Sequence, residues 1–539
     1  MRDAVSSHRP ASPASAAWSP FRHKLFTVLW IGTVVSNIGT WMQNAAAGWL
    51  MTSLSPAPLD VALVQAASTL PMFLFALPAG ALADIVDRRR LLIAMQVAAA
   101  GLSVLFAVAM MLGLGSAKGL LAFIFLSGAA AVLAAPAWQA IVPQLVPLEL
   151  LSPAVALNSV GFNISRAIGP ALAGLSIAAL GIASPFWMNG ALTLIAIATL
   201  VWWRPKPAAD AMPPELFGSA VRAGLRFARY NRHLRATLVH AAGFFPFACV
   251  YWALLPLVAR EQISGGPELY GILLGAIGVG AVAGASLLPM VKARLGADGV
   301  LTAATLVTAL SVLLFAVARE PLTALLACVL AGAAWIAAIA TLNVSAQLAL
   351  PAWVRGRGLA VFASVQFAGL ALGSILWGQV AQSFGLSAAH AIAALALVAV
   401  LPMLRRWRLQ TGSGLDLTPS LHWPTPVLAQ EVEADRGPVM VTIEYVVAPA
   451  ERDGFLTAIA KLAQERRRDG AYEWALYEDA AHAGTFVETF RVDSWLEHMR
   501  QHHRVTNADR VIQDAVQRFH AEGTPLVRHL IAAQRSDKP

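Results

Sequence analysis

One arginine lies deep in a long apolar stretch of this sequence, NSVGFNISRAIGPALAG, at residues 158–174. If this stretch is a membrane helix that begins near Ala154, Arg166 lies about 18 Å along it, near the middle of the lipid core. A guanidinium group there costs at least about 2.5 kcal/mol against lipid, so it must face protein or a water-filled cavity. Two interpretations remain open: Arg166 attracts an anionic or polyphenolic compound, or it hydrogen-bonds backbone carbonyls beside a kink at Pro170.

Amide side chains form a second polar row in the first apolar stretch, where Asn37, Thr40, Gln43 and Asn44 follow helical spacing. Such groups either hydrogen-bond to neighbouring helices or line a cavity. No Asp or Glu occupies the middle of an apolar stretch, so a bound ligand would have to supply any negative charge itself. The candidate substrate-binding residues are therefore Arg166, Asn163, Asn37, Gln43 and Asn44.

The composition indicates that membrane helices hold these residues. The chain of 539 residues is 58% hydrophobic and only 13% charged, whereas soluble domains are about 25% charged. Alternate connections between the apolar stretches carry 21 and three Lys or Arg residues. Because cytoplasmic loops are the basic ones, this asymmetry predicts a multi-pass protein of a bacterial-type inner membrane, with both termini cytoplasmic. We expect the lipid bilayer as a partner and no nucleic acid, since no compact basic face is visible.

Twelve stretches are long enough to cross a membrane, because a span needs about 20 apolar residues. They lie near residues 25–51, 60–82, 91–113, 119–141, 153–181, 184–203, 236–259, 268–291, 299–318, 321–349, 357–383 and 387–404. An offset of 204 residues places the first six on the last six and aligns six pairs of glycines, from Gly39 with Gly243 to Gly181 with Gly385. The sequence therefore predicts an all-α polytopic membrane protein built from two six-helix repeats.

The composition also divides the chain into domains. We expect a disordered tail at 1–21, a six-helix bundle at 22–204, a cytoplasmic linker at 205–235, a second bundle at 236–408, another linker at 409–436, a cytoplasmic α+β domain at 437–533 and a short tail at 534–539. The 205–235 linker contains a basic amphipathic pattern, which is typical of a helix that lies on the anionic inner leaflet.

The connection after the second stretch, GALADIVDRRR, resembles the signature loop of the major facilitator superfamily. Gly80, Asp84, Arg88 and Arg89 match that motif, whereas Asp87 stands where the family has glycine. The resemblance implies the twelve-helix fold of that superfamily and a gate. In that gate Asp84 would face a helix N-terminus while an arginine latches the two halves. A basic anchor on the cytoplasmic side, without a gating role, is the alternative.

Gly169, Pro170 and Gly174 resemble the fifth-helix antiporter motif of facilitator exporters, although two of its glycines are replaced. The exporters' fourth-helix motif is not kept, because Ile124 occupies its arginine position. Together with SNIGTWMQNAAAGWL and APAWQAIVPQLVP, these residues make 22–408 similar to the branch that contains the enterobactin exporter, the transmembrane secretion effectors. That resemblance implies export of a small molecule, either anionic and siderophore-like or another secondary metabolite, by alternating access and proton antiport.

The end of the chain has an ordinary composition, and its pattern reads strand-helix-strand-strand-helix-strand, which predicts a small ferredoxin-like α+β domain. It resembles the antibiotic-biosynthesis-monooxygenase type of domain over residues 437–533. That resemblance implies pairing through the sheets, so we expect a homodimer formed by this domain. His498 and His502 have the spacing of metal ligands, but no third ligand is evident and we expect no metal there.

The expected function is therefore transport of a small-molecule substrate, without enzyme activity and without a cofactor. Two alternatives belong to other classes of protein. In the first alternative, the chain is a transporter fused to an enzyme that modifies the cargo. In the second, it is a membrane receptor that does not transport. Activity of the tail on the cargo would favour the first alternative, and flux in proteoliposomes separates transport from the second.

Overall fold

The computed structural model describes residues 18–204, 217–411, 416–420, 422–423, 426, 432–433, 435–521 and 523–533. The predicted terminal tails and parts of both predicted linkers therefore lie largely outside the described residues. The chain forms two compact units. The first, which we call the membrane unit, comprises Met1–Pro214, His240–Thr341 and Ala363–Arg406. The second, the tail unit, comprises Glu215–Val239, Leu342–Phe362 and Trp407–Pro539, so it includes two loop regions as well as the C-terminal domain.

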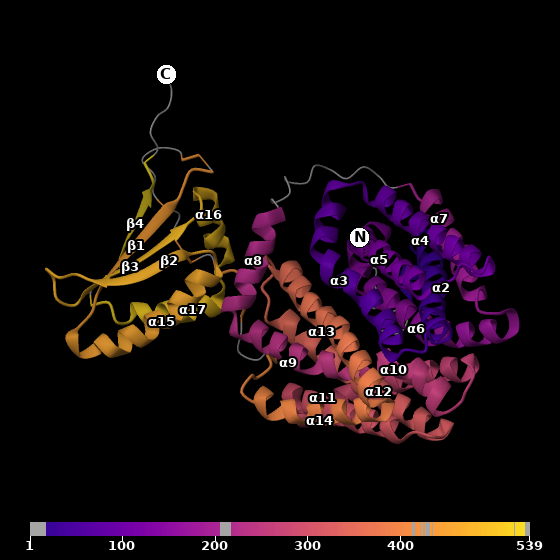
Figure 1. Ribbon diagram of the computed structural model, residues 1–539. Helices are drawn as coiled ribbons and strands as arrows, with labels where there is room; N and C mark the ends of the chain where they lie inside the picture. Colours follow the sequence, from indigo (N-terminus) through magenta and orange to yellow (C-terminus); the bar gives the residue numbers. More distant parts are fainter. Residues whose placement is uncertain are drawn as a thin grey trace, which may run out of the picture. The chain divides into compact units, whose positions relative to one another are not determined.

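The first half of the membrane unit consists of six long helices (Figure 1). These are α2 (Lys24–Leu54), α3 (Pro58–Ile85), α4 (Arg88–Met111), α5 (Ala117–Leu145), α6 (Leu151–Leu180) and α7 (Ser184–Trp202). Two of them begin at side chains that accept a backbone N–H of the first turn. Asp87 accepts from Arg90 at the start of α4, and Ser116 accepts from Gly119 at the start of α5.

The second half contains α9 (Arg232–Ala248), α10 (Val250–Leu257), α11 (Pro267–Val317), α12 (Pro321–Leu348), α13 (Arg355–Phe384) and α14 (Leu386–Leu404). A π-helical turn at Val258–Gln262 follows α10. As one straight helix, the 51 residues of α11 would reach about 75 Å, more than twice the lipid core of about 30 Å. Its backbone breaks at Gly296, where φ is 65°. The segments on either side of this break correspond to two of the spans that the sequence predicts.

Among the described residues, eleven helical segments are long and apolar enough to cross a membrane, counting α11 as one segment. The structure is thus the mostly helical, polytopic arrangement that the sequence predicts. Both halves belong to one compact unit, in which α6 packs against α11 and α3 packs against α10.

The two halves meet at the end of the bundle where α2 ends and α11 begins. A Cβ atom on Gly174 of α6 would lie 2.7 Å from the carbonyl oxygen of Pro267, so the helices approach at backbone distance there. At the same end the guanidinium of Arg260 donates to Thr52 Oγ1 at 2.8 Å and to Ser53 Oγ at 2.7 Å. These contacts close that end of the membrane unit.

The tail unit contains a four-stranded antiparallel sheet in the order β2-β3-β1-β4. The elements follow the chain as β1 (Val439–Val446), α15 (Arg452–Arg468), β2 (Tyr472–Glu478), β3 (Thr485–Val492), α16 (Trp495–Arg504), α17 (Asn507–Gln517) and β4 (Leu526–Ile531). Burial alternates along β1 and β3, as expected when one face of a sheet is covered. Figure 1 shows α15 and α17 side by side next to the strands.

The predicted second helix of this domain is divided into α16 and α17. Thr506 accepts from the backbone N–H of Asp509, and the Asp509 carboxylate accepts the backbone N–H of Thr506. This reciprocal pair starts α17 as a new helix. The tail unit also contains α8 (Phe217–Tyr230), which is the helix expected in the 205–235 linker.

Candidate substrate cavity

A cavity of about 930 Å³ lies within the first half of the membrane unit. Its walls come from α2, α4, α5, α6 and α7. Uncharged polar side chains supply many of the lining groups, namely Thr33, Ser36, Asn37, Thr40, Gln43, Asn44, Gln96, Ser127, Gln139, Asn158, Ser159, Asn163, Asn189, Thr193 and Thr199. Aromatic rings supply others, namely Trp30, Trp41, Trp138 and Phe162. Among the described residues that line it, none is Asp, Glu, Lys, Arg or His.

Four of the five residues that the sequence indicates for binding line this cavity. Asn37, Gln43 and Asn44 come from α2, and Asn163 comes from α6. The side chains of Asn44 and Asn163 are exposed. Asn163 Nδ2 donates to the carbonyl oxygen of Ser159 one turn earlier, at 2.8 Å, which directs its amide along the helix. The geometry therefore brings the two predicted polar rows into one space.

Gln43 is held by a buried hydrogen-bond network. Its Oε1 accepts from Asn189 Nδ2 at 2.6 Å and from the hydroxyl of Ser103, and Asn189 Nδ2 lies 2.8 Å from Ser103 Oγ. Thr193 lies at the edge of this group, 3.5 Å from Asn189 Oδ1. The network joins α2, α4 and α7, so Gln43 has the interhelical role that is the default for such an amide. Sequence reasoning missed Ser103, because a lone serine in an apolar helix gives no signal.

Arg166 is not among the residues that line the cavity. Its guanidinium lies 5.8 Å from the ring of Trp41 on α2 and 5.6 Å from the ring of Trp252 on α10. No ion pair to Arg166 is present within the described part of the chain. Both distances are within the range of cation–π attraction. Because α2 and α10 belong to different halves, Arg166 connects the two halves through aromatic faces.

The three residues of the antiporter-like motif act at helix crossings. A Cβ on Gly169 would lie 2.5 Å from Trp41 Cβ, and Gly174 makes the close approach to α11 described above. A Cβ on Gly271 of α11 would lie 2.9 Å from the carbonyl oxygen of Pro170. Small residues at these positions thus allow α6 to lie between α2 and α11 at backbone distance.

The signature loop is described only in part. Gly80 and Asp84 belong to α3, but their side chains lie outside the described part of the structure, so the gate stays a prediction. Arg89 Nε and Nη2 donate to the carbonyls of Leu200 and Val201, at 2.8 and 2.7 Å, in the last turn of α7. Cationic groups there satisfy free carbonyls and oppose the helix dipole. Arg88 is half-buried at the start of α4, directly after Asp87, which caps that helix in place of the family's glycine.

The histidines of the tail lie together without forming a metal site. His498 Nε2 and His502 Nε2 are 3.3 Å apart, and the ring of His529 lies 4.7 Å from that of His498. Burial, followed by the neighbouring His529, lowers the pKa of His498 to about 3 and that of His502 to about 4. Both rings are therefore neutral at pH 7. Within the described ranges, no group of three His, Cys, Asp or Glu side chains has the arrangement of a metal centre.

His390 is a titratable residue inside a helix of the membrane unit, and sequence reasoning missed it. It lies on α14 with its side chain fully buried, and Nδ1 is 2.8 Å from the carbonyl of Leu386. Its Nε2 has no hydrogen-bond partner among the described residues. Ionisable residues within membrane helices are rare and often functional, which is the signal that should have drawn attention to it.

Solved transporters share the fold of the membrane unit. A crystal structure of the nucleoside transporter NupG aligns with a TM-score of 0.55 at 13% identity, covering 71% of this chain and 99% of that one. A bacterial homologue of the human lysosomal transporter Spinster, in an inward-facing and unoccupied conformation, aligns with a TM-score of 0.52 at 15% identity. That alignment covers 72% of this chain and 95% of the other. At these identities the likeness concerns the fold alone.

Sequence relatives are named as transporters. The multidrug efflux pump Tap of Mycolicibacterium fortuitum is 28% identical over 399 residues, which is 69% of this chain and 91% of the pump. The staphyloferrin A transporter of Staphylococcus aureus is 24% identical over 266 residues, which is 48% of this chain and 65% of that protein. The family model described as transmembrane secretion effector matches residues 15–537, so it extends through the tail domain. The chain therefore belongs to the transmembrane secretion effector family of the major facilitator superfamily.

Proposed function

We propose that this chain exports an uncharged small molecule that carries aromatic rings and hydrogen-bonding groups. The observation that carries the proposal is the cavity of about 930 Å³, whose wall combines tryptophan rings with amides and hydroxyls. Rings stack on the tryptophans, and amides both donate and accept hydrogen bonds. An ionised ligand would leave water without meeting an opposite charge there, which is costly. Neutral siderophore-like molecules and other secondary metabolites include compounds of this kind.

Transport by alternating access requires the halves to separate at the end that is closed in this structure. The Arg260 contacts to Thr52 and Ser53 would then break, and the cavity would open to the other side of the membrane. The distribution of Lys and Arg supports an orientation with both termini in the cytoplasm and the Arg260 end outside. In that orientation this protein, placed in a bacterial plasma membrane, takes its cargo from the cytoplasm.

Proton antiport is the coupling that we propose for this export. His390 is the candidate proton carrier, because it is a buried titratable side chain whose Nε2 lacks a partner among the described residues. Replacement of His390 by Gln substitutes a polar amide of similar size for the imidazole and removes the titration. Vesicles that contain this variant should exchange cargo between their two sides yet fail to concentrate it when a pH gradient is imposed.

A matched series of indole compounds tests the cavity. N-acetyltryptophanamide is neutral, N-acetyltryptophan is an anion and tryptophanamide is a cation, while all three carry the same ring. The purified full chain should bind the neutral compound about tenfold more tightly than either ion. Asn37→Ala combined with Asn163→Ala should weaken that binding, whereas Gln347→Ala, which lies outside the cavity lining, should not. A preference for the anion would contradict the proposed substrate class.

For the tail domain we propose the ferredoxin-like class, supported by the element order and by the sheet order β2-β3-β1-β4. A homodimer through this domain and a cargo-modifying activity of the tail stay predictions. Light scattering on the detergent-solubilised chain tests the first, and incubation of the full chain with an exported compound tests the second.

A further inference from the structure

The C-terminal domain holds two loops that come from the membrane-spanning part of the chain. One loop is the connection between the two halves, which contains helix α8. The other is the segment between α12 and α13, which contains Trp353. All of these residues belong to the tail unit. The two loops meet through an aromatic pair, because the ring of Phe227 on α8 lies edge-on to the ring of Trp353, with centroids 5.8 Å apart.

Two arginines of the domain lie against this aromatic pair. The guanidinium of Arg468 lies 5.5 Å from the ring of Phe227, and that of Arg504 lies 4.6 Å from the ring of Trp353. Both arginine side chains are buried, with 8% and 7% of their surface exposed. Cation–π attraction is stronger when the cation has lost its water, so these contacts are the favourable kind.

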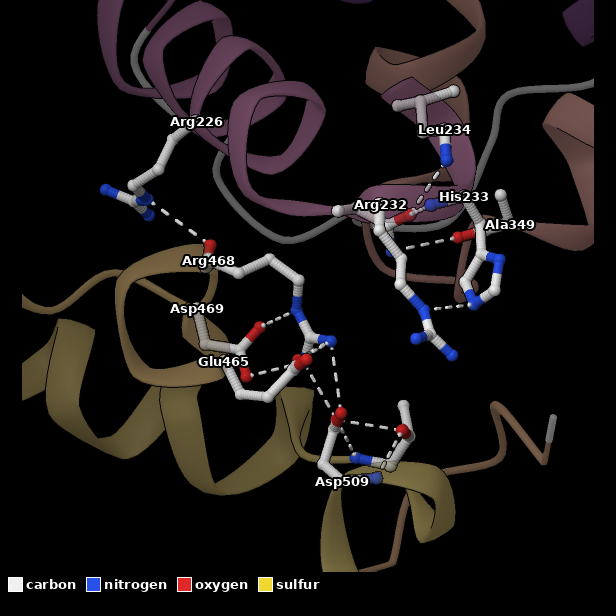
Figure 2. Close-up of polar contacts among 11 residues, drawn as sticks. Arg226, Arg232, His233, Leu234, Ala349, Glu465, Arg468, Asp469 and Asp509 are labelled. Atoms are coloured by element: carbon white, nitrogen blue, oxygen red, sulfur yellow. Dashed lines mark hydrogen bonds and ion pairs between the residues drawn. The ribbon is translucent and has the colours of Figure 1, made fainter. Parts of the chain in front are cut away.

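Each of the two arginines keeps a carboxylate partner within the domain. Figure 2 shows Arg468 among Glu465, Asp469 and Asp509. Its Nη2 lies 2.8 Å from an oxygen of Asp469 and 2.8 Å from one of Asp509. Because the charge is balanced from one side, the guanidinium plane can pack against the aromatic ring without an unpaired buried charge.

An ion pair completes the contact between α8 and the domain. Arg226 Nη2 lies 3.6 Å from Glu497 of α16. Arg226 Nε also donates to the carbonyl of Arg468 at 3.4 Å (Figure 2). A Cβ on Gly470 would approach both Arg226 and Glu497 to 3.2 Å, so the glycine leaves room for this pair. We call this set of contacts the clamp; it consists of Arg226, Phe227, Trp353, Arg468, Glu497 and Arg504.

The ends of three helices of the second half lie at the clamp. Asn231 accepts from the backbone N–H groups of His233 and Leu234 at the start of α9, and its Nδ2 lies 3.5 Å from the carbonyl of Ala349 beyond α12 (Figure 2). Gly224 packs on Arg357 in the first turn of α13, where a Cβ would lie 3.1 Å from Arg357 Cβ. Since α9, α12 and α13 continue from here into the second half, the clamp fixes the spacing of their ends.

We propose that the C-terminal domain is a built-in brake on the transport cycle. While the clamp is closed, it holds the ends of α9, α12 and α13 in the arrangement seen here. In this arrangement the membrane unit is closed at the Arg260 end. Release of the clamp frees these helix ends and lowers the barrier to opening at that end. The brake rests on the proposed alternating access, but both of its tests below are free of cargo.

The first test measures whether the two loops are held jointly. In the full chain, Arg226→Glu replaces the ion pair with Glu497 by two like charges and should release the clamp. Hydrogen exchange should then become about tenfold faster or more in both α8 and residues 349–357. Arg222→Glu is the matched control, because it changes the same charge one turn earlier at an exposed position. Faster exchange in α8 alone would overturn the clamp.

The second test measures the brake itself. Thr52→Cys provides a reporter at the closed end, since Thr52 is buried there and both native cysteines are buried. In this background Arg226→Glu, and separately Phe227→Ala, should raise the rate of labelling by a membrane-impermeant maleimide about threefold or more. Arg222→Glu should leave the rate unchanged. Loosened loops with an unchanged labelling rate would overturn the brake, whatever compound the protein transports.

Discussion

Gln43 and Arg166 are both polar residues in apolar helices, and the structure gives them different surroundings. Gln43 shares a closed set of hydrogen bonds with Ser103 and Asn189, and it also forms part of the cavity wall. Arg166 lies between two tryptophan rings from opposite halves and outside the cavity lining. At the scale of single residues, the geometry therefore favours a bracing role for Arg166 through aromatic rings. The sequence offered backbone carbonyls as the alternative partners of Arg166; the contacts found within the described residues are the two rings.

Substitution of Arg166 separates bracing from cargo binding. Arg166→Gln should lower the stability of the membrane unit by about 1–2 kcal/mol, because two partly desolvated cation–π contacts are lost. Arg166→Lys keeps the charge and should lose less. Affinity for N-acetyltryptophanamide, normalised to folded protein, should stay within about threefold of wild type, since less than 1 kcal/mol is involved. A large loss of affinity in a stable Arg166→Gln protein would restore the cargo interpretation.

Substitution of Gln43 tests the buried network. Gln43→Ala leaves the amide of Asn189 and the hydroxyl of Ser103 without their shared acceptor, which should cost about 1–3 kcal/mol. Asn44→Ala is the matched control on the same helix, because Asn44 is exposed and lines the cavity. Thermal denaturation of the two purified proteins should show a loss for Gln43→Ala only. Equal melting temperatures would mean that the network adds no stability.

Glu465 makes the stability of the tail depend on pH. Burial, only partly offset by Arg468, raises the pKa of Glu465 from 4.5 to about 7. Between these two pKa values the folded domain holds a proton that the unfolded chain releases, so the free energy of unfolding falls as the pH rises. The stabilisation by protonated Glu465 is complete below pH 4.5 and is lost as the pH rises through 7. Its size is about 1–3 kcal/mol. In Glu465→Gln, hydrogen exchange of α15 should be slower than in wild type at pH 8 and similar at pH 4. The same ratio at both pH values would contradict a titration of Glu465.

At the scale of elements, the membrane helices are positioned by glycines where backbones meet. Gly169 and Gly174 place α6 between α2 and α11, and the sequence indicated both residues through a motif. Their structural role depends on which helices pack against each other. A single sequence without homologues does not contain that information. The same limit explains why the sequence predicts the two polar rows of the cavity but does not identify the tryptophan neighbours of Arg166.

Replacement of Gly174 by Val should separate the halves at the closed end. The added side chain would meet the backbone of Pro267 at less than van der Waals distance, which costs roughly 1–3 kcal/mol. The maleimide labelling of Thr52→Cys should accordingly become faster. Gly101→Ala is the control, because no atom lies within 4 Å of a Cβ at that position of α4. Labelling that is equally slow in both variants would show that α6 and α11 adapt without opening.

Regular patterns explain why so much of the fold was predictable. Apolar length and basic loops locate the spans, and period-two alternation locates β1 and β3. The break at Gly296 also agrees with two predicted spans, because a short polar stretch separates them. His390 and the clamp were missed, since one lies alone in an apolar helix and the other joins residues far apart in the chain. Contacts of that kind depend on packing and leave no local pattern.

At the scale of the whole molecule, the tail unit joins the C-terminal domain to two loops of the membrane-spanning part. This unit begins before the domain boundary that the composition suggests, because α8 and residues 342–362 belong to it. The membrane-spanning part should nevertheless fold without the C-terminal domain. That domain has a separate core, formed by residues such as Val441, Phe455 and Phe490.

Removal of residues 409–539 should leave a folded, membrane-inserted transporter. Size-exclusion chromatography and membrane expression measure this directly. The truncated chain should also show fast hydrogen exchange in α8, because Phe227 loses its contact with Arg468. Loss of the truncated protein from the membrane would mean that the domain is needed for folding of the spans.

The uncharged wall of the cavity has an electrical consequence. If the cargo carries no charge, its movement does no work against the membrane potential. If one proton is exchanged for it, as proposed, that proton is the one ion that crosses in each cycle. A proton that moves inward through 100 mV releases about 2.3 kcal/mol, enough to concentrate a neutral cargo almost fiftyfold by voltage alone. The protein would then be a current generator, and liposomes that contain it should develop a voltage, negative on the side the protons leave, whenever cargo flows down its own gradient.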